Sequence, residues 1–154
     1  MWEQFQRYRA LDPLARRLFW SSVRLLPMIR VSLRSRGYKK TQEWLQRRLC
    51  STNANVSQQQ EHAAVPLTCR MVNAGAHYGF IRPTCLEESL ALLYFLRAQG
   101  IAPQIRIGVR KTNGKFEAHA WVEYQGETLN QSQRIHEHYA AFDNEFSEPP
   151  AGTP

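Results

Sequence analysis

The pattern of hydrophobic and polar positions predicts a helical first third of the chain. Asp12 followed by Pro13 suits a helix start, because the acid accepts from free backbone N–H groups and proline lacks one. Apolar residues then recur at helical spacing up to Pro27, which is expected to kink or end this helix. A basic helical piece continues to Gly37, a helix-stopping residue, and a third short helix is expected over residues 41–49.

The strongest predicted helix covers residues 85–99, in the middle of the chain. Thr84 and Glu87 form a capping-box pattern, in which each side chain bonds a backbone N–H group of the first turn. Gly100 lies where a helix C-terminal cap belongs. Residues 90–96 are apolar on almost every side, so this helix is expected to be central and buried.

After this helix the hydrophobic period changes to two, which is typical of half-buried strands. Residues 105–110 alternate apolar and polar, and Asn113-Gly114 is a hairpin signal. A second strand is expected over residues 116–124, a turn at Gln125-Gly126 and a third strand over residues 127–131. Helices followed by an antiparallel meander, without βαβ repeats, predict the α+β class.

The 154 residues suffice for one domain, which we divide into four segments. Residues 1–50 form a basic helical region that packs on the core, with 12 Lys and Arg against three acids, a net charge of +9. Residues 51–62 are a polar linker, residues 63–143 the core, with a further helix over residues 66–77, and residues 144–154 a disordered tail. The basic region is typical of a solvated helical surface, or it suggests an acidic partner, a nucleic acid or an anionic membrane face.

Composition argues against several classes of protein. No apolar run approaches the roughly 20 residues of a membrane span. The first residues lack the apolar segment of a signal peptide, so a cytoplasmic protein is expected. Three cysteines, an odd number, argue against a disulfide framework and leave core packing or a reactive thiol.

Cys85 is the candidate for a reactive thiol, because it begins the strongest helix. Unpaired N–H groups and the positive end of the helix dipole favour the thiolate there. The same N–H groups could hold the oxyanion of an acyl intermediate. A cysteine at this place can equally serve packing, so the position alone does not indicate catalysis.

A cysteine nucleophile also needs a base, and His119 is the candidate. The apolar alternation of its strand runs through Phe116, Ala118, Ala120 and Val122, which we expect to face the core. His119 then faces the other way, between small neighbours that leave room for a substrate and a thiol. A surface histidine is the alternative.

Strand register suggests an orienting group for that histidine. If residues 125–126 form a two-residue turn, Trp121 pairs with Asn130, which then lies one diagonal step from His119 on the same face. A longer turn would bring in Gln131 instead. A strand-ending Asn without a catalytic role remains open.

Several segments together resemble the transglutaminase-like cysteine proteases that remove leader peptides during lasso-peptide maturation. The matching segments are TCLEESLALLYFLRAQGI, IRIGVRK, FEAHAWVEY, GETLN and the basic LARRLFWSSVRLLPMIRVSLR. The resemblance covers most of residues 12–143 and implies a papain/transglutaminase-like α+β core with a Cys–His–Asp triad. Cys85 and His119 match the first two members. The third departs, because LNQSQ carries no acid before Glu137, so Asn130 would take the role of the Asp.

The resemblance further implies a stand-alone leader peptidase that needs no cofactor or metal. Its partners would be the precursor peptide with its leader, a separate leader-recognition protein and a lasso cyclase. The basic region would dock the leader or the recognition protein. No nucleic acid and no stable membrane insertion are expected.

Three alternatives remain open. The same acyl-enzyme could pass its acyl group to an amine, as transglutaminases do, or the chain could be a catalytically degenerate peptide-binding scaffold. A zinc site from Cys69, His77 and Cys85 has spacings that fit no common structural pattern.

Overall fold

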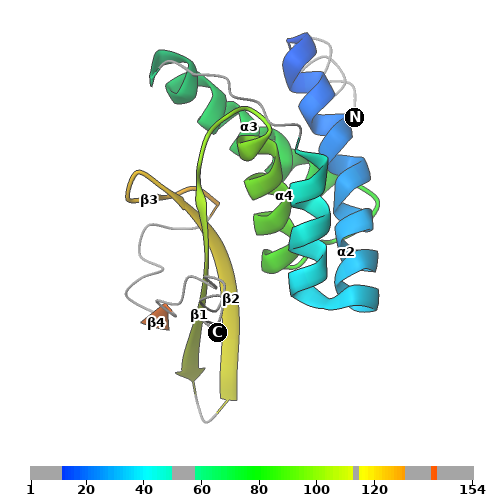
Figure 1. Ribbon diagram of the computed structural model, residues 1–154, viewed down its shortest axis with the longest axis vertical. Helices are drawn as coiled ribbons and strands as arrows, with labels where there is room; N and C mark the ends of the chain where they lie inside the picture. The colour runs from blue at the N-terminus through cyan, green and yellow to red at the C-terminus, as the bar shows by residue number, and fades with distance from the viewer. Residues whose placement is uncertain (1–11, 50–57, 113–114, 131–139, 142–154) are drawn as a thin grey trace, which may run out of the picture.

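The computed structural model describes residues 12–49, 58–112, 115–130 and 140–141. Helices come first and one antiparallel sheet follows, with strand order β3-β2-β1-β4. Figure 1 shows the helices to one side of this sheet, a mixed arrangement that confirms the predicted α+β class. The elements are α2 (Pro13–Arg48), α3 (Gln58–Tyr78), α4 (Cys85–Arg97), β1 (Gln104–Thr112), β2 (Lys115–Tyr124), β3 (Glu127–Thr128) and β4 (Ala140–Ala141).

Helix α2 begins as predicted and consists of two helices that meet at a kink at Gly37, where the sequence predicts a stop. The carboxylate of Asp12 accepts from the N–H of Leu14 at 3.2 Å, and proline occupies the first turn. Pro27 does not end the helix, because buried Leu26 and Ile29 on either side hold it against the core. The regular backbone breaks only at Gly37, whose φ of 78° favours glycine.

Helix α3 begins at Gln58, inside the segment expected as a linker. The expectation for residues 51–62 is therefore wrong for residues 58–62, and residues 51–57 lie outside the described part of the chain. A tertiary contact accounts for the early start, since Glu61 accepts from the hydroxyl of Tyr124 at 2.5 Å. The helix expected over residues 66–77 is thus the second part of a longer one, with Pro66 inside it.

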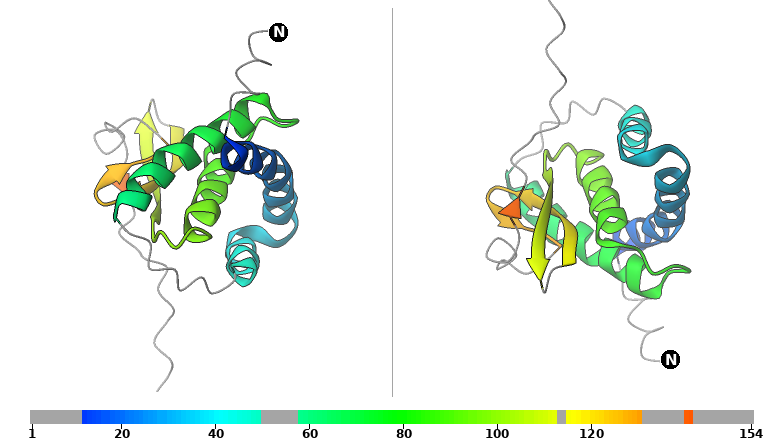
Figure 2. Two further views of the ribbon diagram at one scale, coloured as in Figure 1. Left: turned by 90° about the horizontal axis from the view of Figure 1, so that it is seen from above. Right: turned by 90° about the horizontal axis from the view of Figure 1, so that it is seen from below.

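Helix α4 is the central element of the fold. Its capping box at Thr84 and Glu87 is present as predicted, and Gly100 follows the helix with a φ of 81°. The helix contacts α2, α3, β1 and β2. Figure 2 shows it between α2 and the sheet. Its buried side chains include Leu90, Leu92 and Leu96, which explains the almost uniformly apolar run.

The first half of β2 departs from the predicted burial pattern. Phe116, expected in the core, is 75% exposed, because the β1–β2 hairpin extends beyond the helices (Figure 1). Further along, Trp121 and Val122 are both 0% exposed, so both faces of the sheet are covered there. The face that carries His119 is therefore not the open surface that alternation predicted.

The β2–β3 turn has the predicted two-residue form. Gln125 and Gly126 have φ of 51° and 82°, and Tyr124 pairs with Glu127. Strand β3 then stops at Thr128, before the predicted end at residue 131. Strand β4, which pairs with β1, was not predicted, and the expected tail over residues 144–154 lies outside the described residues.

Helices α2 and α3 approach each other closely at Gly75. A Cβ atom there would lie 2.8 Å from Cβ of Ser22 and 3.4 Å from the backbone N of Val23. Since a backbone cannot give way as a flexible side chain can, only glycine fits without movement of α2.

Replacing Gly75 with Ala is therefore expected to destabilise the fold by about 1–3 kcal/mol. Helix propensity alone would give the opposite sign, a gain of about 0.5–1 kcal/mol. Urea unfolding measures the difference, with His62→Ala, exposed on the same helix, as control. A stabilised Gly75→Ala variant would contradict the close approach.

Candidate active site

Cys85 is the first residue of α4, directly after its N-terminal cap. The side chain of Thr84 accepts from the N–H of Glu87 at 3.4 Å, and the carboxylate of Glu87 accepts from the N–H of Thr84 at 2.8 Å. These two bonds fix the direction in which the chain enters α4, and the helix starts at Cys85. The N–H groups of Cys85 and Leu86 have no acceptor within the helix, so they are available to an oxyanion beside the sulfur.

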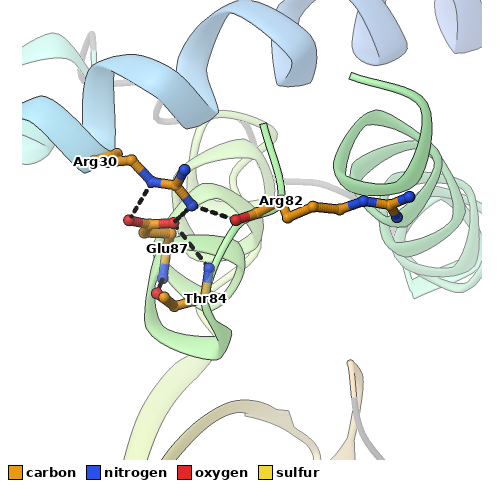
Figure 3. A network of polar contacts seen from close by, with 4 residues as sticks. All are labelled: Arg30, Arg82, Thr84 and Glu87. Atoms are coloured by element: carbon orange, nitrogen blue, oxygen red, sulfur yellow. Dashed lines mark hydrogen bonds and ion pairs between the residues drawn. The ribbon is translucent and has the colours of Figure 1, made fainter. Parts of the chain in front are cut away.

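A buried ion pair holds this helix start against α2. Arg30 donates to both carboxylate oxygens of Glu87, from Nε at 2.9 Å and from Nη2 at 2.8 Å, and Nη2 also donates to the carbonyl of Arg82 (Figure 3). Burial alone would raise the pKa of Glu87, but the bonds from Arg30 and Thr84 and the charges of Arg30 and Arg34 outweigh it and lower the pKa. Glu87 is therefore ionised in the folded protein at neutral pH.

His119 lies on β2, opposite Gly108 of β1, and is partly buried. The next residue, Ala120, is joined to α4, because its carbonyl accepts from the hydroxyl of Ser89 at 3.1 Å. Ser89 lies four residues, about one helical turn, after Cys85. The elements that carry the predicted nucleophile and the predicted base therefore meet one turn from the sulfur.

The side chain of Asn130 belongs to the same junction. Its Oδ1 accepts from the N–H of Val122 at 2.9 Å, and its Nδ2 donates to the hydroxyl of Ser89 at 2.9 Å. Within the described residues, its amide makes no hydrogen bond to His119. Asn130 thus links β2 to α4, and its role as a third catalytic member stays a prediction.

The sequence did not single out Ser89, although a signal was present. A hydroxyl in a helix that is apolar on almost every side needs a partner, because a buried polar group without one is costly. Ser89 is 0% exposed and bonds both Ala120 and Asn130.

In the part of the chain that the structure describes, no hydrogen bond joins the thiol of Cys85 to the imidazole of His119. Catalytic hydrogen bonds are often long or poorly aligned until a substrate binds. The pairing of these two side chains stays a prediction.

A cavity of about 670 Å³ lies along α4, between α3 and the residues that follow β3. Glu88 and Leu92 of α4 line it. They follow Cys85 by three and seven residues, a spacing that places the three side chains on one face of the helix. Burial raises the pKa of Glu88. The lining also includes Cys69, Asn73, His77 and Asn130.

The cavity wall contains the thiol of Cys69, which is a poor nucleophile. Burial raises the pKa of Cys69 to about 11. At neutral pH this thiol is protonated, and only the thiolate attacks carbonyls and alkylating agents. Cys69 is thus a packing cysteine in the cavity wall.

Family comparison identifies the class of protein. The chain matches the transglutaminase-like superfamily over residues 25–142, a stretch that includes Cys85, His119 and Asn130. It belongs to the transglutaminase-like superfamily, whose members are typically cysteine proteases or acyltransferases. No curated protein matches the chain, and no solved structure does.

None of the helices in the described ranges is long and apolar enough to cross a membrane. No three His, Cys, Asp or Glu side chains among the described residues are grouped so that they could hold a metal ion.

Cys69 is expected to react with iodoacetamide at pH 8 about 100-fold more slowly than the same thiol in urea-unfolded protein, because its raised pKa suppresses the thiolate. Its rate should rise with pH up to about 11, which quantitative mass spectrometry can follow. Equal rates in folded and unfolded protein would contradict the assigned burial.

Asn130→Ala is expected to cost roughly 1–3 kcal/mol of unfolding free energy, because it removes the acceptor of the Val122 N–H and the donor to Ser89. The cost of the Asn130→Ala/Ser89→Ala double variant should be smaller than the sum of the two single costs, since the two side chains share one bond, while Ser89 also loses its bond to the carbonyl of Ala120. Urea unfolding of the four proteins gives the coupling. Full additivity would show that the two residues act independently.

Proposed function

We propose that the chain is a cysteine endopeptidase that removes the leader peptide from a ribosomally made lasso-peptide precursor in the cytoplasm. The observation that carries the proposal is the position of Cys85, the first residue of the capped central helix in a transglutaminase-like chain. A helix start of this kind offers the sulfur both a stabilising dipole and free N–H groups. The segments that resemble leader peptidases supply the substrate class.

The proposed reaction proceeds through an acyl-enzyme. The sulfur of Cys85 attacks the scissile carbonyl carbon, and the free N–H groups at the start of α4 hold the resulting oxyanion. His119 first takes the thiol proton and then gives it to the leaving amine, so the C–N bond breaks and a thioester remains. Water, deprotonated by His119, then attacks the thioester and releases the carboxylate and the thiol. Asn130 is proposed as the third member, which keeps β2 and its histidine in place.

The cavity along α4 is the proposed place for part of the substrate. Its wall from Glu88 and Leu92 starts within one helical turn of Cys85, and its other walls come from α3 and from Asn130. A peptide bound there would extend from the sulfur along the helix. Mixed polar and apolar walls suit a peptide chain better than a flat apolar ligand.

Helix α2 supports the proposal of a protein partner. Trp20, Met28 and Val31 are exposed on it by 46%, 43% and 65%, among many arginines. Exposed apolar side chains with a basic surround suit an acidic partner that also carries apolar groups. We assign this surface to the leader or to a separate leader-recognition protein, with a lasso cyclase acting after cleavage.

Acyl transfer to an amine is the second candidate, because the superfamily includes acyltransferases and the first half of the reaction is the same. The mass of the products separates the two. Hydrolysis gives a free leader carboxylate, whereas transfer from a glutamine gives ammonia and a new amide bond.

Cys85→Ala is expected to lower leader cleavage by more than about 10³-fold with little loss of stability, because it removes the nucleophile and only one sulfur atom. The assay uses a precursor peptide with the recognition protein present, and mass spectrometry detects the released leader. Cys50→Ala, which removes a thiol that the proposed mechanism does not use, is the matched control and should retain activity. Cleavage by the Cys85→Ala variant at the parent rate would exclude the mechanism.

A further inference from the structure

The ion pair between Arg30 and Glu87 lies in the same helical turn as the proposed nucleophile, on the face of α4 that meets α2 and not on the face of Cys85. Glu87 follows Cys85 by two residues, and its side chain is 7% exposed. The carboxylate is shared between the guanidinium of Arg30 and the N–H of Thr84, the residue that precedes Cys85 (Figure 3). A continuous set of contacts therefore runs from α2 to the helix start that carries the sulfur.

The guanidinium of Arg30 compensates the negative charge that the capping box places at the start of α4. A capping carboxylate fixes the helix start, but its negative charge opposes a second negative charge on a nearby sulfur. Because the carboxylate is buried, water screens that repulsion weakly. A cation that bonds the carboxylate on both oxygens removes most of the opposing field and leaves the cap intact.

Arg30 also holds the segment that leads into α4. Its Nη2 donates to the carbonyl of Arg82, which comes three residues before Cys85, while the side chain of Arg82 points away from Glu87 (Figure 3). One guanidinium thus bonds the approaching backbone and the cap together. The orientation of the Cys85 side chain at the start of α4 depends on both the segment before α4 and the cap.

We propose that Arg30 is a positioning residue for the Cys85 thiol, which fixes the start of α4 and compensates the charge of Glu87, so that the thiol keeps its reactivity. This inference rests on the proposed nucleophilic role of Cys85. It gives the basic N-terminal helix a part in building the active site, besides any docking of a partner.

Other charged groups surround this end of α4 and set the background for the effect. Arg34 of α2 also attracts the Glu87 carboxylate without a hydrogen bond to it. Glu88 of α4 and Arg70 and His77 of α3 line the cavity along the helix, and the segment before α4 carries Arg82. None of them is changed in the variants below.

The test measures the alkylation rate of Cys85 by iodoacetamide at pH 7 in a Cys50→Ser background. Trypsin places Cys85 on the peptide of residues 71–97, apart from Cys69 on the peptide of residues 49–70, so mass spectrometry reads each thiol separately. The variants are Arg30→Gln, Arg30→Lys, Glu87→Gln and the Arg30→Gln/Glu87→Gln double variant. Arg36→Gln, exposed on the same helix, is the matched control, and circular dichroism gives the folded fraction.

Arg30→Gln is expected to slow alkylation of Cys85 by roughly 3- to 30-fold, because it leaves the partly screened charge of Glu87 uncompensated. Glu87→Gln should leave the rate unchanged or raise it, and the double variant should recover to within about threefold of the parent. Arg30→Lys should keep most of the rate, because it keeps the charge. The rate of Cys69 should stay constant throughout.

A purely structural ion pair predicts a different pattern, in which loss of either partner is equally harmful, so that Glu87→Gln slows alkylation as much as Arg30→Gln does. That pattern, or an Arg30→Gln rate within twofold of the parent, would overturn the proposal. If Arg30→Gln does not fold because it leaves a buried charge unpaired, the double variant decides, since it contains no such charge. A double variant tenfold slower than the parent then contradicts the proposal.

The parent protein separates this inference from the proposed function. If Cys85 of the parent reacts no faster than in urea, Cys85 is not an activated thiol and the proposed function fails. If it reacts faster and Arg30→Gln leaves the rate unchanged, only the role of Arg30 fails.

Discussion

The carboxylate of Glu87 is the point on which the architecture of this protein depends. It caps α4 through Thr84 and accepts both hydrogen bonds of Arg30 from α2. Helix α4 in turn contacts α3 and both long strands. The helix that carries Cys85 is therefore fixed at its first turn by a charge that is buried and compensated. A buried carboxylate is tolerated only where hydrogen bonds and a cation replace the lost water, and the lowered pKa of Glu87 shows that they do so here.

A second junction, one turn further along the helix, fixes the sheet. Ser89 bonds the carbonyl of Ala120 and the amide of Asn130, and Asn130 bonds the N–H of Val122. The first junction fixes the start of α4, where Cys85 lies. The second junction fixes β2, the strand that carries His119, against that helix. The match to the transglutaminase-like superfamily spans both junctions.

The sequence predicted well those ends of helices and strands that one or two neighbouring residues determine. The cap at Thr84, the stop at Gly37 and the turn at Gln125-Gly126 each follow from one or two residues, and all three are present. The early start of α3 was missed because it depends on a contact between Glu61 and Tyr124, 63 residues apart. The burial of Trp121 and the role of Ser89 were missed for the same reason. For the site, the sequence could name Cys85 and His119 as candidates, but the bonds of Asn130 to Val122 and Ser89 arise only when β2 meets α4.

The central claim is that the sulfur of Cys85 and the imidazole of His119 meet where α4 and β2 join. A crystal structure of the protein with a peptide aldehyde that mimics the leader end tests it most directly, because the aldehyde carbon bonds the nucleophilic sulfur. The account predicts a hemithioacetal at Cys85 with an imidazole nitrogen of His119 within about 3–4 Å of the sulfur or the new oxygen. An aldehyde bonded elsewhere, or an imidazole on the opposite side of the sheet from the sulfur, would contradict it.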